Sequence, residues 1–353
     1  MLVLVITAKS TEAKTCADNN DEHSYDVTLF MPDAKISEFW SASHNFARSV
    51  AKHLNINLKI ISLEGFKRTR FGFLQLITQT LTERHKPDFI LSIMYGGGEY
   101  AQLELFNKLS VPFITFNSSL GPLELRVTQN PREQFQHWKA HMSPDEFSAG
   151  ANVVANLVAQ KGGTTLAILG GSTTSVVNKH RIEGALKQAK AESISVLAPV
   201  YTDWSVQRSM FATRTILRRA PDVDMIWTAA PEIADGARRV LAELNKSAVI
   251  GSFDWTDTNI QLIEQGDLAF SYGGHFTEAG WAIILLYDYL RGSDFATELG
   301  TMILSQLKKM DRSNINDVKY LLHKRNWSDT DFRTYSKCLN PLRDSYDFTL
   351  SPK

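Results

Sequence analysis

Residues 27–54 read VTLFMPDAKISEFWSASHNFARSVAKHL, and this stretch decides the fold class. Its first part, residues 27–31, is almost entirely apolar or β-branched, which favours a buried β-strand. Residues 37–54 then repeat apolar side chains with the helical period, and Ser37 is suited to cap that helix. One face of the predicted helix carries Phe39, Phe46, Ala47, Val50 and Leu54. A strand followed by an amphipathic helix is the unit from which parallel sheets are built.

The alternation of strand and helix continues along the chain. Further strands are predicted at residues 58–63, 89–92 and 112–116, with amphipathic segments between them. Residues 117–144 break this rhythm, and we interpret the irregular segment as the first passage between two lobes. A second series of strands is predicted at residues 165–169, 194–201, 225–228, 249–253 and 268–272. The pattern predicts an α/β protein with two Rossmann-like lobes, whose parallel sheets bring their strand-end loops to one cleft.

Length and composition agree with two lobes. A chain of 353 residues exceeds what a single hydrophobic core usually fills. Hydrophobic residues make up 43% and charged residues 22%, which is ordinary globular usage. Lys plus Arg and Asp plus Glu both number 38, so no overall charge attracts nucleic acid. We therefore expect a monomer without a nucleic-acid partner.

The N-terminal residues allow two interpretations. Residues 1–7, MLVLVIT, are apolar and are interpreted as the remnant of a signal peptide, followed by a polar, flexible arm up to residue 25. The alternative is a short N-terminal strand of a cytoplasmic protein. Cys16 and Cys338 lie near opposite ends of the chain, and they either form a disulfide or stay apart, because sequence does not give their separation.

The motifs of common enzyme classes are missing from the sequence. Nine histidines occur without the HExxH spacing, and no GxSxG elbow is present. The two cysteines do not form a metal or redox motif. We therefore expect a protein that is not an enzyme and that needs neither a metal nor a cofactor.

Aromatic and polar residues follow the predicted strand ends. Trp40, Trp204 and Trp255 are suited to stack on the apolar face of a sugar-like ring, or else to cover the edges of the lobes. The guanidinium of Arg181 can bind two oxygens at once, and the alternative is a surface arginine. Further candidate ligand contacts are Lys35, Asn117, Asp203, Glu232, Asp254 and His275.

Several short motifs resemble the type I periplasmic sugar-binding proteins, the ribose-binding-like solute receptors of ABC importers. The resemblance covers residues 26–304 and rests on MPDAKISEFW at 31–40, PFITFN at 112–117, RIEG at 181–184, DVDMIW at 222–227 and GSFD at 251–254. It implies that aromatic residues near Trp40 stack on a sugar, while Arg181, Asn117 and Asp254 bind its hydroxyls.

The resemblance also implies a domain arrangement in which the chain crosses between the lobes three times. The N-terminal lobe would comprise residues 26–120 and 274–298, and the C-terminal lobe residues 140–273 and 299–312. In this arrangement a helix at 276–290 returns to the N-terminal lobe, and a strand near 301–304 crosses back. The remaining tail, residues 313–353, is polar and is expected to contain one or two helices, but its low periodicity does not assign their positions.

The function implied is that of a periplasmic receptor that closes on a sugar or sugar-like ligand and delivers it to an ABC permease. Two loops depart from the family pattern, reading AAPE at 229–232 and GGH at 273–275. The opening motif and Asn117 are also similar to the receptor for autoinducer-2, although that receptor's second cleft arginine falls on Gly274. A receptor that presents its closed form to a membrane kinase or cyclase is the alternative, and an α/β enzyme is the third.

Overall fold

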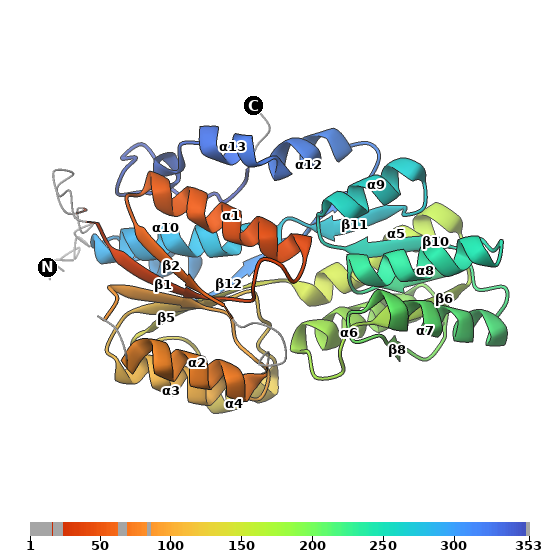
Figure 1. The fold of residues 1–353 in the computed structure, drawn as a ribbon, viewed down its shortest axis with the longest axis horizontal. Coiled ribbons are helices and arrows are strands. Elements are labelled where there is room, and N and C mark those ends of the chain that lie inside the picture. The colour runs from red at the N-terminus through yellow and green to blue at the C-terminus, as the bar shows by residue number, and fades with distance from the viewer. Residues whose placement is uncertain (1–15, 17–23, 63–68, 83–85, 351–353) are drawn as a thin grey trace, which may run out of the picture.

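The computed structural model describes residue 16 and residues 24–62, 69–82 and 86–350, which form two α/β lobes lying side by side (Figure 1). The predicted signal remnant and arm, residues 1–25, fall almost entirely outside the described residues.

The sheet of the first lobe has the strand order β12-β5-β4-β3-β1-β2, and all of its strand pairs are parallel. Its strands are β1 (Asp26–Phe30), β2 (Asn57–Ile61), β3 (Phe89–Ser92), β4 (Phe113–Phe116), β5 (Trp138–Pro144) and β12 (Met302–Ser305). The inner strands β3 and β4 read FILS and FITF and are buried throughout, as expected for a parallel sheet that is covered on both faces.

Helices cover both faces of this sheet. The pair α1 and α10 packs on one face, and α2 and α3 lie on the other, with α4 beside α3 (Figure 1). Their bounds are α1 (Glu38–His53), α2 (Arg70–Thr82), α3 (Glu99–Lys108), α4 (Pro122–Thr128) and α10 (Glu278–Leu290), and the short α11 (Ala296–Leu299) follows α10. The predicted cap of the first helix is confirmed, because the side chain of Ser37 accepts a hydrogen bond from the backbone of Trp40.

The sheet of the second lobe has the order β13-β11-β10-β9-β6-β7, and β8 also pairs with β6. Its strands are β6 (Thr165–Gly170), β7 (Ser195–Val196), β8 (Val200–Tyr201), β9 (Met225–Thr228), β10 (Val249–Phe253), β11 (Phe270–Gly273) and β13 (Lys308–Met310). Only β13 runs antiparallel to its neighbour among these described strands. The helices are α5 (Glu146–Lys161), α6 (Val176–Ala191), α7 (Val206–Arg219), α8 (Pro231–Glu243) and α9 (Asp257–Gln265).

The chain crosses between the two sheets three times before its tail. The crossings run from β5 to α5, from β11 through the 3₁₀ helix η2 (His275–Thr277) to α10, and from β12 to β13. The predicted fold, two Rossmann-like lobes joined by a three-crossover hinge, is therefore confirmed.

The predicted lobe boundaries need two corrections. Residues 140–144 and 302–305 were expected in the second lobe, but both segments lie in the first sheet, where β5 and β12 pair with each other. The segment 117–144 is also not irregular, since it contains α4 and β5. Strand β5 reads WKAHMSP and contains no β-branched residue, so the usual strand pattern does not reveal it.

One further expectation about secondary structure was wrong, and one about the tail was right. The strand predicted at 194–201 is two short strands, β7 and β8, interrupted before Val200 by Pro199, which has no N–H to give to a sheet. The tail, in which one or two helices are expected, contains the two α-helices α12 (Ile315–Leu322) and α13 (Lys324–Asp329) and the 3₁₀ helix η3 (Phe332–Tyr335). Cys16 and Cys338 form a disulfide with their Cα atoms 5.3 Å apart, which decides between the two alternatives for these cysteines.

Candidate ligand-binding site

Tight turns directly after strands hold several of the predicted site residues. Asn117 follows β4, Asp254 follows β10, and Asp203 and Trp204 follow β8. Their backbones are left-handed, with φ of 54°, 69°, 53° and 61° respectively. Asn and Asp tolerate this conformation better than most residues, whereas a bulky residue such as Trp204 adopts it only where its surroundings hold it there. These turns fix the side chains beyond the carboxyl ends of the strands, which is where α/β sheets bind ligands.

Arg181 lies on α6 with 3% of its surface exposed. Its Nε and Nη2 donate to the two carboxylate oxygens of Glu146 on α5, with 2.9 Å between Nη2 and Oε1. Its Nη1 donates to the carbonyl oxygen of Ala229 at 2.9 Å, and its guanidinium carbon lies 4.1 Å from the ring centre of Phe253. The sequence analysis expected the guanidinium to bind two oxygens of a ligand, but its Nε and Nη2 bind the two oxygens of Glu146 instead. N–H groups on both Nη atoms remain for a further acceptor.

Asp254 and His275 face each other where the second crossing leaves β11. The distance between His275 Nε2 and Asp254 Oδ1 is 3.6 Å, and no described residue donates a hydrogen bond to that oxygen. Burial raises the pKa of Asp254 to about 7 against the opposing effect of Arg181, and Glu232 raises it further. Burial and the charge of Arg181 hold the pKa of His275 well below its usual value, so its imidazole is neutral. A buried acceptor and a neutral imidazole therefore lie side by side, which suits a ligand hydroxyl.

Glu278 ties Asn117 to the hinge. It is the first residue of α10 and is 1% exposed. Its carboxylate accepts hydrogen bonds from the hydroxyl of Ser305, at the end of β12, and from the side-chain amide of Asn117 at 3.3 Å. Burial raises the pKa of Glu278 to about 8. One buried carboxyl group thus joins the second and third crossings to a predicted ligand contact.

Two acidic side chains, Glu38 and Glu232, lie near each other on opposite lobes. Burial raises the pKa of Glu232 at the start of α8, and the charge of Glu38 on α1 adds to this effect. Glu38 itself accepts hydrogen bonds from the backbone N of Thr258 at 3.0 Å and from its hydroxyl at 2.7 Å. Because Thr258 belongs to the first turn of α9, this contact joins α1 to the second lobe.

The lobes also meet at a second place. Gly96, after β3, lies so close to the second lobe that a Cβ on it would be 3.2 Å from the carbonyl oxygen of Thr174. Gly121 likewise lies next to His180 on α6, where a Cβ would be 3.3 Å from the imidazole Nε2. Together with the Glu38–Thr258 contact, these approaches show that the lobes touch outside the chain crossings, and we call this the closed arrangement.

The three predicted stacking tryptophans have different surroundings. Trp40 is partly exposed, and its ring centre lies 5.0 Å from that of Phe39, which in turn lies 4.6 Å from the ring of His275. Trp204 is also partly exposed and lies against the backbone of Gly171, where a Cβ would be 2.4 Å from its ring. Both rings keep exposed surface near the strand ends, as a stacking role requires.

Trp255 differs from these two because it is buried and bonded. Its indole N–H donates to the carbonyl oxygen of Lys308 at 3.1 Å, and its ring lies against Gly273 and Gly274. The side chain therefore fastens β11 to β13. Two other candidates, Lys35 and Asp203, are exposed.

The structure therefore brings together four of the predicted residues, namely Arg181, Glu232, Asp254 and His275, through short contacts or charge interactions. It also adds two carboxylates that the sequence analysis missed, Glu146 and Glu278. Each occupies the first turn of a helix directly after a lobe crossing. A glutamate there is ordinary because it complements the helix dipole, so the sequence carries no signal that separates these two from other first-turn acids.

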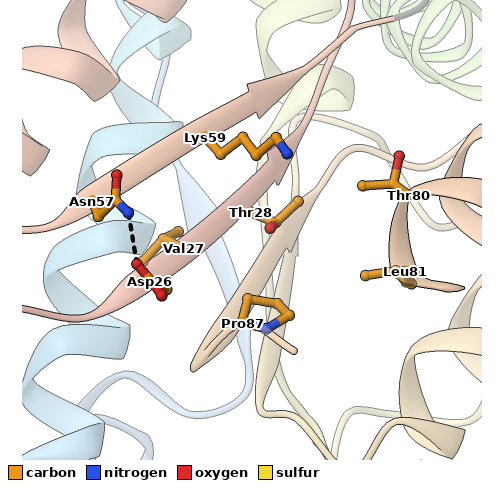
Figure 2. A pocket seen from close by; sticks show the side chains of 8 residues that line it. All are labelled: Asp26, Val27, Thr28, Asn57, Lys59, Thr80, Leu81 and Pro87. Atoms are coloured by element: carbon orange, nitrogen blue, oxygen red, sulfur yellow. Dashed lines mark hydrogen bonds between the residues drawn. The ribbon is translucent and has the colours of Figure 1, made fainter. Parts of the chain in front are cut away.

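A hollow elsewhere in the first lobe lies at the opposite end of the strands. Figure 2 shows it beside the start of β1 and β2, with the side-chain amide of Asn57 donating to Asp26 at 2.7 Å. It is lined by Asp26, Val27, Thr28, Asn57, Lys59, Thr80, Leu81 and Pro87. Because ligands of such sheets bind at the carboxyl ends of the strands, this hollow is not the candidate site.

The part of the chain that the structure describes contains no cluster of His, Cys, Asp and Glu suited to hold a metal ion. In the same residues, no helix has both the length and the apolar character needed to cross a membrane.

Comparison with known proteins identifies the family. The profile of the family described as "Periplasmic binding protein domain" matches residues 27–294, which is most of the chain. The chain belongs to this family. Periplasmic binding proteins bind solutes and do not transform them, so this binding protein is not an enzyme.

Solved structures share the fold of the binding protein. A periplasmic sugar-binding protein from Pseudomonas fluorescens superposes with a TM-score of 0.79 at 22% identity, covering 91% of this chain and 96% of the other. A periplasmic solute-binding protein of an ABC transporter from Actinobacillus succinogenes 130z, solved with bound D-allose, gives 0.71 at 17% identity, covering 83% and 99%. The predicted type I fold is thus confirmed.

A curated relative matches over a shorter segment. The binding protein is 28% identical to the ribose import binding protein RbsB of Haemophilus influenzae over 132 residues, 37% of this chain. The match spans 45% of the length of that relative. The similarity to the autoinducer-2 receptor stays a prediction.

Proposed function

We propose that the binding protein is a periplasmic receptor that closes its lobes on a sugar or a sugar-like polyol and delivers it to an ABC importer. The observation that carries the proposal is the buried pair of Asp254 and His275, which offers a hydroxyl-binding oxygen and a neutral imidazole where the two lobes meet. Relatives described as sugar-binding, including the D-allose complex and RbsB, support the same ligand class.

The surroundings of this pair suit a neutral, hydroxylated ring. The positive charge of Arg181 is balanced by its ion pair with Glu146, so the remaining N–H groups do not require an anionic ligand. The partly exposed ring of Trp40 lies beside Phe39 and provides an apolar surface for the face of a sugar ring. A polyol needs both the N–H groups of Arg181 and the ring of Trp40, because its rim is polar and its face is apolar.

The disulfide supports the proposed location. Disulfides persist in oxidising compartments such as the bacterial periplasm and are rare in the cytosol. The Cys16–Cys338 bridge therefore favours the signal-remnant interpretation of the N-terminal residues over a cytoplasmic one.

A thermal-shift screen against pentoses, hexoses, polyols and autoinducer-2 tests the proposal. A true ligand at 100 times its dissociation constant stabilises the protein by about 2.7 kcal/mol, which raises the melting temperature measurably. Asp254→Asn removes the acceptor charge and Trp40→Ala removes the aromatic surface, so both should reduce the shift. Lys161→Ala, at an exposed position in the last turn of α5, serves as the control and should leave the shift unchanged.

Three results would contradict the proposal. If no sugar or polyol shifts the melting temperature, the ligand class is wrong. If a sugar binds but both variants bind it as the unchanged protein does, the site lies elsewhere. Recovery of the bound sugar in chemically altered form would contradict the role of a receptor.

A further inference from the structure

The tail that follows β13 is fastened to the back of the second lobe. The guanidinium of Arg312 donates from Nε to the carbonyl oxygen of Ile263 and from Nη2 to that of Glu264, both at 3.1 Å. These carbonyls belong to the last turn of α9, which a cation stabilises. Lys319 on α12 forms an ion pair with the carboxylate of Glu264. The first half of the tail therefore moves with α9.

The second half of the tail is fastened to the first lobe. Trp327 on α13 is 3% exposed, and its ring centre lies 5.6 Å from that of Phe46 on α1. Phe332 is fully buried against the same Phe46 ring at 5.2 Å. Trp327 also lies 5.5 Å from Phe276, the neighbour of His275 in the second crossing. This half of the tail therefore moves with α1 and with the hinge.

A buried carboxyl group and the disulfide anchor the end of this second half. Asp288 on α10 is fully buried and accepts hydrogen bonds from the hydroxyl of Ser336, the backbone N of Lys337 at 2.8 Å and the hydroxyl of Tyr346 at 2.9 Å. Cys338 lies in the same loop and carries the disulfide to Cys16. The anchor on the first lobe is thus both covalent and hydrogen-bonded.

The connection between the two halves of the tail is short. Only His323 separates the end of α12 from the start of α13. The indole N–H of Trp327 donates back to the carbonyl oxygen of Leu321 at 2.6 Å, which fixes the second helix to the first. In Figure 1 the two helices run along one side of the molecule, over α9 and α1.

We propose that residues 311–348 form a strap that holds the lobes in the closed arrangement. Opening the cleft rotates one lobe against the other and moves α9 relative to α1. Since the strap is attached to both helices and its two halves are joined by one residue, opening must detach one end. The strap thus adds a connection outside the three hinge crossings and favours the closed population in the ligand-free protein as well.

The test measures the distance between the lobes without any ligand, so its result does not depend on the proposed function. Spin labels carried by noncanonical amino acids replace Lys108 on the first lobe and Glu192 on the second, both exposed, and leave the native disulfide intact. Double electron–electron resonance then reports the distribution of interlobe distances. In the otherwise unchanged full-length protein we expect one dominant distance.

Two variants release the strap from α9 at exposed positions. In R312A/K319A we expect a second, altered distance whose population relative to the closed form rises about threefold to tenfold, because exposed ion pairs and hydrogen bonds stabilise only weakly. E264A removes the partner of Lys319 from the side of α9 and should act in the same direction.

The matched control is R214A, which removes an exposed ion pair with Glu243 within the second lobe. Its distance distribution should equal that of the unchanged protein. The proposal is overturned if R312A/K319A keeps the single closed distance, or if R214A opens the lobes to the same extent.

Discussion

Arg181 and Glu146 form a buried ion pair in which each residue depends on the other. Their side chains are 4% and 2% exposed, and two hydrogen bonds join them. Glu146→Ala leaves the guanidinium buried without its carboxylate, so the free energy of unfolding should fall by about 3–5 kcal/mol. Urea unfolding followed by circular dichroism measures this loss.

The exposed pair of Arg214 and Glu243 is the control for this prediction. Their side chains are 43% and 46% exposed, so Glu243→Ala should change the free energy of unfolding by about 1 kcal/mol or less. Equal losses in the two variants would mean that Glu146 contributes no more than a surface charge.

Glu278 should make the stability of the protein depend on pH. Its pKa is raised by burial from 4.5 to about 8 in the folded state. Between these values the unfolded chain loses the proton that the folded chain keeps, so the contribution of Glu278 to stability is greatest below pH 4.5 and falls as pH rises toward 8. In Glu278→Gln this component is absent, so the fall between pH 5 and pH 8 should shrink by roughly 2–4 kcal/mol.

Urea unfolding at a series of pH values checks this prediction. Glu298→Gln is a useful control, because Glu298 is paired with Lys337 near the surface. A Glu278→Gln protein whose stability falls with pH as steeply as that of the unchanged protein would show that another group carries the dependence.

At the scale of residues, the sequence predicted polar side chains at the ends of strands, but it did not predict the carboxylates that bind Arg181 and Asn117. Asp254 and Asn117 were predicted because they directly follow apolar strands, and both lie in left-handed turns there. Glu146 and Glu278 were missed because a first-turn glutamate looks the same whether it faces solvent or a buried arginine. Which carboxylate meets Arg181 depends on how two helices pack, and no local pattern records that.

Among the elements, the helix pair α5 and α6 sets the position of this ion pair. A Cβ on Gly150 of α5 would lie 2.0 Å from the carbonyl oxygen of Arg181, and one on Gly184 of α6 would lie 1.9 Å from that of Phe147. The two glycines let the helix backbones touch. The sequence motif RIEG, residues 181–184, therefore combines a site residue with the glycine that its helix needs for packing.

Gly184→Ala should force the two helices apart. We expect a loss of about 1–3 kcal/mol in the free energy of unfolding, since the backbones must move to make room for the methyl group. The shift also displaces Arg181 from Glu146, so ligand affinity should fall together with stability. The control Asn152→Ala, at an exposed position of α5, should leave the free energy of unfolding within about 0.5 kcal/mol of its original value.

At this scale, the predictions from sequence depended on how regular each element is. The strands of β-branched and aromatic residues were found, whereas β5, with its lysine, histidine and proline, was not. The tail was expected to contain one or two helices, but their positions were not predicted, because their aromatic residues pack on rings of α1 and α10 that are distant in sequence.

For the whole molecule, the Glu38–Thr258 contact is the clearest bond between the lobes. Glu38→Ala removes two accepted hydrogen bonds at the start of α9, so we expect the closed population to fall and ligand affinity to drop by roughly threefold to tenfold. Small-angle X-ray scattering should show a larger radius of gyration in this variant.

Glu104→Ala provides the comparison, since Glu104 forms an exposed ion pair with Lys108 of its own helix. A smaller radius of gyration in Glu38→Ala would contradict the prediction. It would show that repulsion between Glu38 and Glu232 outweighs the hydrogen bonds.

The arrangement of the whole molecule was predicted through resemblance and not through periodicity. The alternation of strands and helices indicated two sheets, but only the family resemblance implied three crossings. The boundaries were wrong where β5 and β12 return to the first sheet, because pairing between strands far apart in sequence leaves no local trace.

The disulfide described above closes a covalent ring around almost the entire chain, since its cysteines are 322 positions apart. While the disulfide is intact, the denatured chain is a closed loop with fewer conformations. In the chain-entropy description this raises the free energy of unfolding by on the order of 5 kcal/mol. If a protease cuts the chain once between the two cysteines, the disulfide still joins both fragments in one molecule. Such a nick should separate the fragments on a denaturing gel only after a thiol has been added.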